Sequence, residues 1–178
     1  MKVIDLSLMG AKLIVPKVFH DERGFFRETY RKPLYEQVGI DVPFVQDNHS
    51  FSKGGTLRGM HFQTFPGQAK LVSVMVGKIY DVFVDIRPES PTFGKWEGIE
   101  LDDVSGQQLF IPVGFAHGFY VMSESAHVTY KVSAIYNPET EKSFRYDDPE
   151  VGIQWPNTHP LVSLRDLSAP SFRQGVPV

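Results

Sequence analysis

The feature that most constrains the fold is a series of short segments in which apolar and polar side chains alternate. In residues 126–136 the side chains that share one face are Val128, Tyr130, Val132, Ala134 and Tyr136. Residues 79–86 alternate in the same way, with Asp81, Phe83 and Asp85 on the second face. A period of two is typical of strands with one face in a core. The chain is therefore predicted to be all-β.

Turn residues separate these segments and set the architecture. The chain has 15 Gly, 13 Pro and 14 Phe, which suits many short strands joined by tight turns. Further strands are expected at 12–15, 25–30, 44–50, 56–63, 71–76, 96–101, 107–112, 143–148 and 152–156, with a hairpin turn at 76–78. Helical signals occur at 33–39, which starts with proline and ends at glycine, and weakly near 164–167. These patterns predict one domain, 1–178, built as an antiparallel β-sandwich or jelly roll.

Charge and composition exclude several classes of protein. The formal net charge is −3 and the basic residues are scattered, so we expect no nucleic-acid or anionic-lipid partner. The chain has no cysteine, which removes disulfides, zinc–thiolate sites and thiol nucleophiles. No apolar run approaches membrane-spanning length, and the first residues lack the apolar core of a signal peptide. A soluble cytoplasmic protein is the expectation.

Residues 56–70 concentrate the side chains that could form a site. They place Arg58, His61 and Lys70 on or beside one predicted strand, and all three side chains can stabilise a negative charge. Strict alternation would place Arg58 and His61 on opposite faces. If both serve one pocket, the alternation must break between them, and Gly59 is the expected position of a bulge. The short turn that follows would keep His61 and Lys70 close in space.

Several polar residues leave two interpretations open. Glu28 shares a face with aromatic neighbours, so it either faces inward or is solvated on an edge strand. Residues 46–48 either contact a ligand from a strand or belong to a solvated loop. For Asp81 and Asp85, solvent exposure is the expected fate.

A histidine and two tyrosines raise the same question. His117 lies between small residues in a predicted glycine-flanked turn. There its imidazole could either contact a ligand closely or donate a hydrogen bond to backbone carbonyl groups. Tyr130 and Tyr136 face inward, either around an interior that is not completely filled or as core tyrosines with satisfied hydroxyls.

Eight motifs occur in one order along nearly the whole chain. They are DERGFF (21–26) with Glu28, QDN (46–48), LRGMHFQ (57–63), residues 81–87, SPTFG (90–94), IPVGFAHG (111–118), YK (130–131) and GIQWP (152–156). With this set the chain resembles the dTDP-4-dehydrorhamnose 3,5-epimerase family. The resemblance implies a cupin-like antiparallel jelly roll with a few short helices, a homodimer that shares strands, and a place in dTDP-rhamnose biosynthesis.

The resemblance also implies a role for individual residues at the positions that match the motifs of the family. It makes His61 the catalytic base and Tyr130 the proton donor, places Lys70 near the keto oxygen of the sugar, and makes Asp166 the carboxylate that orients His61. The positions that fall at substrate contacts are Arg23, Glu28, Gln46, Asn48, Arg58, His117 and Glu141. Phe26 is the candidate to stack on thymine, Arg165 occupies a position that is usually lysine, and Tyr136 is a candidate to influence which carbon is reprotonated.

The chemistry of the implied reaction suits these residue types. In dTDP-4-keto-6-deoxyglucose the ketone acidifies the hydrogens on carbons 3 and 5. A base removes one of them, and an acid on the opposite face returns a proton, which leads to dTDP-4-keto-L-rhamnose without a redox step. We therefore expect no metal and no cofactor. A neutral imidazole suits the base, and a preorganised cation at the enolate oxygen can contribute roughly 3–4 kcal/mol. Arg23 and Arg58 would pair with the diphosphate.

Three alternatives compete with this interpretation. A metal-dependent cupin normally needs a His-x-His pair, but His61 is followed by Phe62 and Gln63. A non-catalytic sugar-nucleotide-binding jelly roll would have no need for all four proposed catalytic groups. An epimerase that inverts only one carbon of a related nucleotide-linked 4-keto sugar would share most of these motifs, and the sequence leaves that alternative open.

Overall fold

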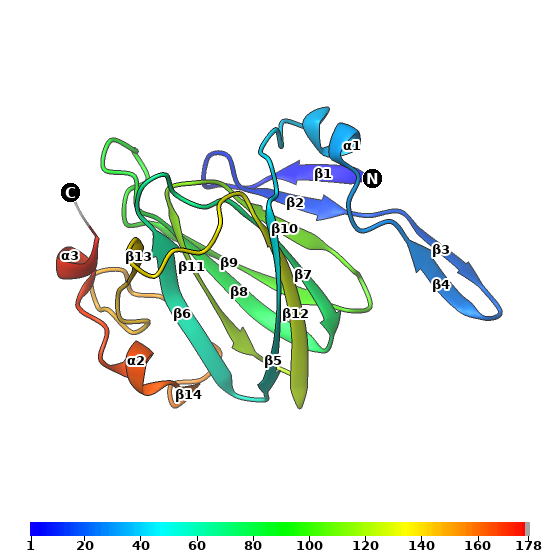
Figure 1. Cartoon of the computed structure of the whole chain (residues 1–178). Helices are drawn as coiled ribbons and strands as arrows, with labels where there is room; N and C mark the ends of the chain where they lie inside the picture. Colours follow the sequence, from blue (N-terminus) through cyan, green and yellow to red (C-terminus); the bar gives the residue numbers. More distant parts are fainter. Residues whose placement is uncertain (177–178) are drawn as a thin grey trace.

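Two sheets that face each other form the body of the protein (Figure 1). The structure, a computed structural model, describes residues 1–176, so the last two residues of the predicted 1–178 domain lie outside it. The first sheet contains, in spatial order, β1 (Lys2–Asp5), β2 (Lys12–Val15), β10 (Gln108–Ile111), β7 (Lys70–Val76), β12 (Ser125–Val132) and β5 (Gln46–Lys53). The second contains β13 (Glu141–Ser143), β6 (Thr56–Gln63), β11 (Phe115–Val121), β8 (Lys78–Asp85) and β9 (Trp96–Asp102).

Pairing in both sheets is antiparallel except at one short strand. This strand, β14 (Leu161–Val162), lies parallel to β6. The helices are short: α1 (Lys32–Glu36), α2 (Leu164–Leu167) and α3 (Phe172–Gly175). The predicted all-β, antiparallel jelly-roll architecture with a few short helices is confirmed. No helix in residues 1–176 is both long enough and apolar enough to cross a membrane.

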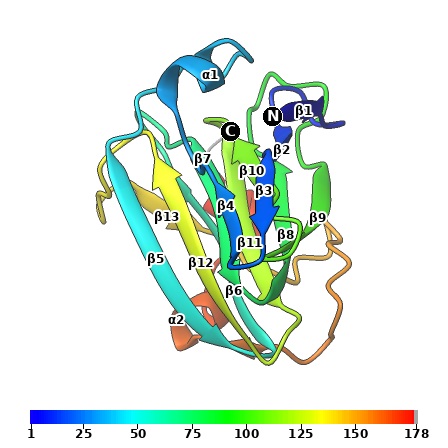
Figure 2. The same ribbon diagram turned by 90° about the vertical axis from the view of Figure 1, so that its right-hand side faces the viewer.

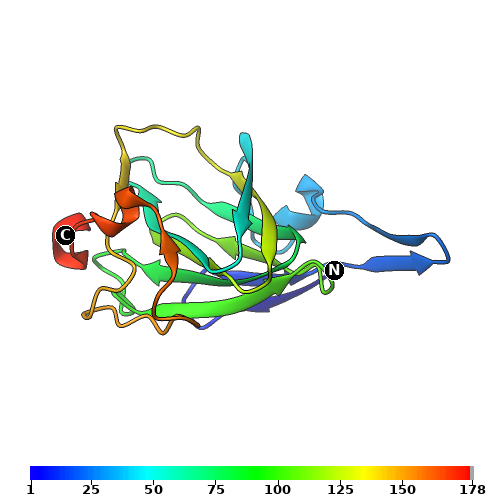
Figure 3. The same ribbon diagram turned by 90° about the horizontal axis from the view of Figure 1, so that it is seen from below.

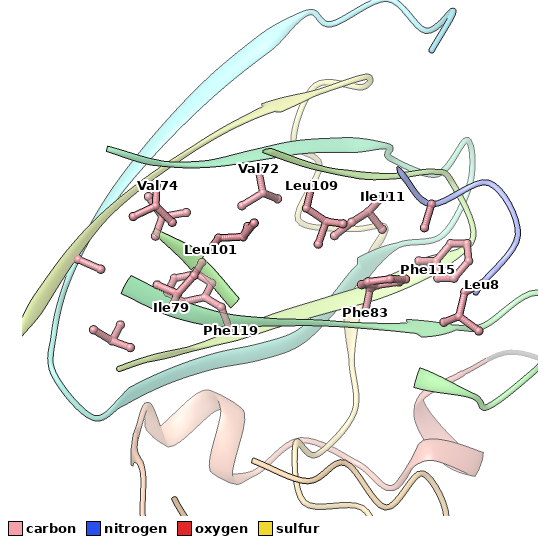
Figure 4. Close-up of a cluster of buried hydrophobic side chains, with 14 residues drawn as sticks. Leu8, Val72, Val74, Ile79, Phe83, Leu101, Leu109, Ile111, Phe115 and Phe119 are labelled. Carbon is pink, nitrogen blue, oxygen red and sulfur yellow. The ribbon is translucent and has the colours of Figure 1, made fainter. Parts of the chain in front are cut away.

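The main core lies between the two sheets. Figure 4 shows Val72, Val74, Leu109 and Ile111 of the first sheet meeting Ile79, Phe83, Phe115 and Phe119 of the second. Burying one such side chain contributes about 1.5–3 kcal/mol. Because side chains two residues apart share a face of a strand, the same inner faces also carry Lys70, Asp81, His117 and Tyr130. The interior of the sandwich is thus apolar over most of its extent and polar in one region.

Two smaller clusters cover the outer faces. One joins Tyr35 of α1 and Ile40 to Ile14, Leu71 and Phe110 of the first sheet. The other joins Phe172 of α3 and Phe144 to Met60, Phe62 and Val82 of the second sheet. Because the second cluster holds the C-terminal segment against β6, α2 lies close to the strand that carries His61.

A hairpin projects from the body on the side opposite the C-terminal helices (Figures 1 and 3). It consists of β3 (Val18–Asp21) and β4 (Gly24–Arg27), and it points toward the viewer in Figure 2. Its aromatic side chains are unusually exposed, including Phe25 at 57% and Phe26 at 69%. We call residues 18–27 the arm.

The structure corrects several predicted elements. The predicted hairpin at 76–78 is wrong, because β7 pairs with β10 and β12 whereas β8 pairs with β9 and β11. Gly77 instead turns the chain from one sheet to the other with φ of 87°, and an added Cβ would lie 2.1 Å from the Ser125 carbonyl oxygen. A periodic pattern predicts a strand but not its partner.

Other errors concern strand ends. The strand predicted at 25–30 stops at Arg27, the one predicted at 126–136 stops at Val132, and 143–148 and 152–156 form no strand beyond Ser143. The turn predicted around His117 is also wrong, since this residue lies in the middle of β11. Glycines on both sides of His117 suggested a turn, but Gly118 is needed because an added Cβ would lie 2.8 Å from the Arg58 carbonyl oxygen on the neighbouring strand.

Candidate active site

A bulge in β6 places Arg58 and His61 on the same face of the sheet. His117 of β11 is opposite His61 and Phe119 is opposite Arg58, so β6 advances three residues where β11 advances two. Gly59 allows this with φ of 135°. Met60 and Phe62 consequently join the outer cluster. The predicted break in alternation at Gly59 is confirmed.

His61 forms a close pair with a carboxylate from the C-terminal segment. Nε2 of His61 lies 2.6 Å from Oδ1 of Asp166, which is almost completely buried in α2. Ser163 caps this helix by accepting a hydrogen bond from the Asp166 N–H, and the Gly59 N–H donates to Oδ2 of Asp166 at 3.4 Å. A carboxylate only accepts, so Nε2 of His61 carries the hydrogen and Nδ1 is left as the basic nitrogen.

The surroundings of Asp166 keep it ionised. Burial opposes the charge, but hydrogen bonds from His61, the Gly59 N–H and Ser163 more than offset it, so the pKa of the Asp166 carboxyl lies below its usual value. The negative charge stabilises His61 whenever the imidazole takes up a proton.

A cavity of about 240 Å³ brings half of the expected site residues together. Three of the four proposed catalytic groups line it, namely His61 from β6, Lys70 from β7 and Tyr130 from β12. The expected contact residues that also line it are Gln46, Asn48, Tyr136 and Glu141, accompanied by Phe62, Gln63 and Gln68. The fourth catalytic candidate, Asp166, lies behind His61.

Burial shifts the pKa values of Lys70 and Tyr130, the two candidate catalytic residues on the first sheet, in opposite directions. It lowers the pKa of Lys70 to about 8, although the charges of Asp81 and Glu141 partly oppose this. It raises the pKa of Tyr130, with Arg58 acting against that shift and Glu141 adding to it. At pH 7 the cavity therefore contains an ammonium group and a protonated phenol.

Hydrogen bonds fix the polar wall of the cavity. In β5, Gln46 donates to Oδ1 of Asn48 at 2.8 Å, and its Oε1 accepts from the Tyr136 N–H at 2.9 Å. Asp47 points to the other face of the strand and pairs with Lys131. For Gln46 and Asn48 the structure therefore supports the interpretation of a strand entering a pocket, and for Asp47 the solvated one.

A second chain of hydrogen bonds closes one side of the cavity. The Tyr136 hydroxyl donates to Oε2 of Glu141 at 3.0 Å, and Nη2 of Arg165 donates to the same oxygen at 2.5 Å. Tyr136 lies beyond the end of β12 and is 47% exposed, so it is not a core tyrosine.

An adjoining groove of about 550 Å³ shares His61 with the cavity. Its lining includes the cationic side chains Lys53, Arg58 and Arg165, together with Ser52 and Asp166. Nε of Arg58 donates to Oγ of Ser52 at 2.9 Å, which holds the guanidinium at the groove. Lys53 and Ser52 were not among the residues expected at the site, although they follow the 46–48 motif on the same strand.

His117 lies beside the cavity as a buried residue and does not line it. Its Nε2 is 2.9 Å from both oxygens of Asp81, which is fully buried. The expectation that Asp81 and Asp85 face solvent is wrong. Asp85 accepts hydrogen bonds from Arg87, Ser90 and Thr92, and although burial acts against ionisation these bonds lower the pKa of Asp85 to about 2. Partners from the following loop satisfy this carboxylate, which the strand pattern alone does not reveal.

Three expected contact residues lie away from both the cavity and the groove of their own chain. Arg23 and Phe26 belong to the arm, where Arg23 pairs with Asp21. Glu28 follows β4 and pairs with Arg31 at the surface, so within one chain it is a solvated glutamate. Among residues 1–176, no three histidine, aspartate or glutamate side chains are grouped as a metal ion would require.

Comparison with known proteins gives a consistent result. The family model for dTDP-4-dehydrorhamnose 3,5-epimerase matches residues 5–174. The dTDP-4-dehydrorhamnose 3,5-epimerase of Neisseria gonorrhoeae is 50% identical over 175 residues, covering 98% of this chain and 53% of that protein, so the chain spans about half the length of this relative. The enzyme of the same name from Methanothermobacter thermautotrophicus is 47% identical over 155 residues, covering 87% of this chain and 84% of that protein.

A solved structure extends the similarity to three dimensions. The crystal structure of dTDP-6-deoxy-D-glucose-3,5-epimerase from Legionella pneumophila, in complex with dTDP-4-keto-L-rhamnose, matches with a TM-score of 0.94 and 45% identity. The match covers 97% of this chain and 93% of that chain. By sequence and by fold, the chain belongs to the dTDP-4-dehydrorhamnose 3,5-epimerase family.

Proposed function

We propose that the protein epimerises dTDP-4-keto-6-deoxyglucose at carbons 3 and 5 and yields dTDP-4-keto-L-rhamnose. One observation carries the proposal: a single cavity is lined by an imidazole backed by a buried carboxylate, an ammonium group and a protonated phenol. These are the base, the electrostatic stabiliser and the acid that proton transfer next to a ketone requires.

His61 acts as the base in this proposal. Its Nδ1 takes a hydrogen from a carbon next to the ketone, and Asp166 stabilises the imidazolium that forms. The electrons of the broken C–H bond move onto the keto oxygen, giving an enolate. Lys70 supplies the positive charge beside this oxygen, and with a pKa of about 8 it is mostly protonated at pH 7.

Tyr130 returns a proton from the opposite side. His61 comes from the second sheet and Tyr130 from the first, and both line the cavity. A sugar ring held between the sheets would therefore present one face to the base and the other to the acid. Removal from one face and return to the other inverts the carbon.

The neighbouring groove suits the diphosphate. Arg58 and Arg165 line it, and it meets the cavity at His61. A ligand with its sugar in the cavity and its diphosphate in the groove would pair two negative groups with two guanidiniums.

We also propose that the protein acts as a homodimer in which the arm of one copy completes the site of the other. The support is that Arg23, in the turn between β3 and β4, and Phe26, on β4, belong to the projecting hairpin and do not line the cavity of their own chain. Three exposed phenylalanines on so short a hairpin are more readily explained by burial against a partner. In that arrangement Arg23 would reach the diphosphate and Phe26 the thymine.

The test is incubation of the purified protein with dTDP-4-keto-6-deoxyglucose in deuterated water, with deuterium in the sugar counted by mass spectrometry. Two deuteriums, at carbons 3 and 5, are expected. One deuterium would replace the proposal with a single-carbon epimerase, and none would contradict enzymatic action on this sugar.

A further inference from the structure

Two histidine–carboxylate pairs lie side by side on adjacent strands. His61 of β6 and His117 of β11 are direct partners in the sheet, and each has its Nε2 against a buried aspartate. The proposed mechanism uses the His61–Asp166 pair. It gives no role to Asp81, although this carboxylate is fully buried.

Asp81 points into the interior that also contains Lys70. On β8, Asp81 lies between Ile79 and Phe83, and both of these side chains belong to the core between the sheets. On the facing sheet, Lys70 lies two residues before Val72, which belongs to the same core. The carboxylate and the ammonium therefore face one interior from opposite sheets.

The ammonium of Lys70 needs a compensating charge there. It is only 8% exposed, and no carboxylate of residues 1–176 forms a direct ion pair with it. The carboxylates that favour its charged form are Asp81 and Glu141. Glu141 is already neutralised by Arg165 at 2.5 Å, whereas the partner of Asp81 is a histidine whose pKa is lowered by burial. The hydrogen-bond partner of Asp81 is therefore an uncharged imidazole, whereas the partner of Glu141 is a guanidinium.

The same contact determines the hydrogen on His117. Because Asp81 can only accept, Nε2 of His117 carries the hydrogen and Nδ1 is an acceptor. The other titratable groups that line the cavity are His61 on β6, Tyr130 on β12, Tyr136 beyond the end of β12 and Glu141 on β13.

We propose that Asp81 is a positioning residue that keeps the Lys70 ammonium charged and holds His117 as the Nε2–H tautomer. The consequence for catalysis rests on the proposed function. The effect on Lys70 and His117 does not, because it is a property of the protein without substrate.

The first experiment therefore uses the unliganded protein. Lysine side chains labelled with ¹³C at Cε are titrated by NMR, and the Lys70 signal is assigned by its loss in Lys70→Met. In Asp81→Asn the titration midpoint of Lys70 should fall by about one pH unit. Asp85→Asn is the matched control, because Asp85 is equally buried on the same strand but pairs with Arg87, and the midpoint should stay at the wild-type value.

An unchanged Lys70 midpoint in folded Asp81→Asn would overturn the proposal. Thermal unfolding shows whether the variant is folded. A second comparison of Lys70 midpoints uses Asp81→Ser, which removes the carboxylate, and Asp81→Glu, which retains it. In the same samples, ¹⁵N shifts of His117 should report the Nε2–H tautomer in the wild type. The opposite tautomer would contradict the second half of the proposal.

The second experiment links the charge to turnover. In Asp81→Asn the alkaline decline of kcat should move to lower pH by the shift measured for Lys70, while kcat at pH 6 stays within about threefold of wild type. An equal loss at every pH would identify a merely structural role. If the wild type does not turn over the sugar at all, the proposed function fails, and the NMR titration still decides the role of Asp81.

Discussion

Nε2 of His61 lies 2.6 Å from Oδ1 of Asp166, a residue 105 positions further along the chain. The contact depends on two local features, the bulge at Gly59 and the capped helix α2. It joins the strand that carries the proposed base to the C-terminal segment.

Asp166→Asn should lower the rate of solvent deuterium exchange into the sugar by roughly 100-fold. The amide removes the charge that stabilises the imidazolium and can reverse which imidazole nitrogen carries hydrogen. NMR of the sugar in deuterated water measures the rate. Asp147→Asn is the control, because Asp147 pairs with Arg145 at the surface and its loss should leave exchange unchanged. A near-normal rate in folded Asp166→Asn would exclude a role for the carboxylate in proton transfer.

Lys70→Met should make the protein more stable and less active. The pKa of Lys70 is about 8 in the folded protein against 10.5 ordinarily, so burial of the ammonium costs stability fully below pH 8 and progressively less as pH rises toward 10.5. At pH 7 the substitution should raise the free energy of unfolding by about 3 kcal/mol, measured by urea denaturation. Turnover should fall by at least about 100-fold because the enolate loses its cation.

The control for this prediction is Lys78→Met, which removes a partly exposed lysine that pairs with Glu100. Its stability should change by less than about 1 kcal/mol. Loss of stability in Lys70→Met would show that Lys70 is satisfied in the fold, contrary to the account given above.

Gly59 and Gly24 have nearly the same φ but differ in how closely neighbouring atoms approach them. Replacing each by alanine therefore distinguishes the cost of backbone strain from the cost of steric overlap. Gly59 has φ of 135° and Gly24 has φ of 133°, but an added Cβ would lie 2.6 Å from Gly118 Cα at Gly59 and would meet nothing within 4 Å at Gly24. Gly59→Ala should therefore lower the free energy of unfolding by about 2 kcal/mol more than Gly24→Ala. It should also reduce activity, because the bulge places Arg58 and His61 together. Equal losses of stability would mean that the strands separate easily at this point.

Mixing inactive subunits tests the proposed exchange of arms. If the arm completes the partner's site, His61→Ala chains mixed one-to-one with chains carrying Arg23→Ala and Phe26→Ala should form heterodimers with one intact site each. After dissociation and reassembly, about a quarter of wild-type activity should return. A mixture of His61→Ala and Lys70→Met chains is the control and should stay inactive, since both residues line the cavity of one chain. No recovery in the first mixture, with dimers present, would contradict the exchange.

Sequence patterns predicted elements whose determinants are local. The strand 56–63 was predicted with the bounds that the structure shows, and the bulge followed from one glycine and the requirement that Arg58 and His61 meet. The helix that begins near Pro33 was also expected, and it is shorter than predicted, ending at Glu36.

The errors arose where contacts between distant residues decide the outcome. The sequence around Gly77 is compatible with a hairpin turn. Because β7 pairs with β10 and β12, Gly77 instead connects a strand of the first sheet to a strand of the second. Asp81 alternates with apolar residues as a solvated strand residue would, yet the neighbouring strand supplies His117 and buries it. Arg23 and Phe26 were grouped with the site by resemblance, but a single chain holds them away from the cavity.

The central claim is that His61 and Tyr130 perform different halves of one inversion from opposite sheets of a single cavity. The most direct measurement compares His61→Ala and Tyr130→Phe in deuterated water, following both deuterium incorporation and the stereochemistry of the sugar. The account predicts that His61→Ala abolishes exchange, whereas Tyr130→Phe retains some exchange but loses inversion. Equal and complete loss of exchange in both variants would contradict it.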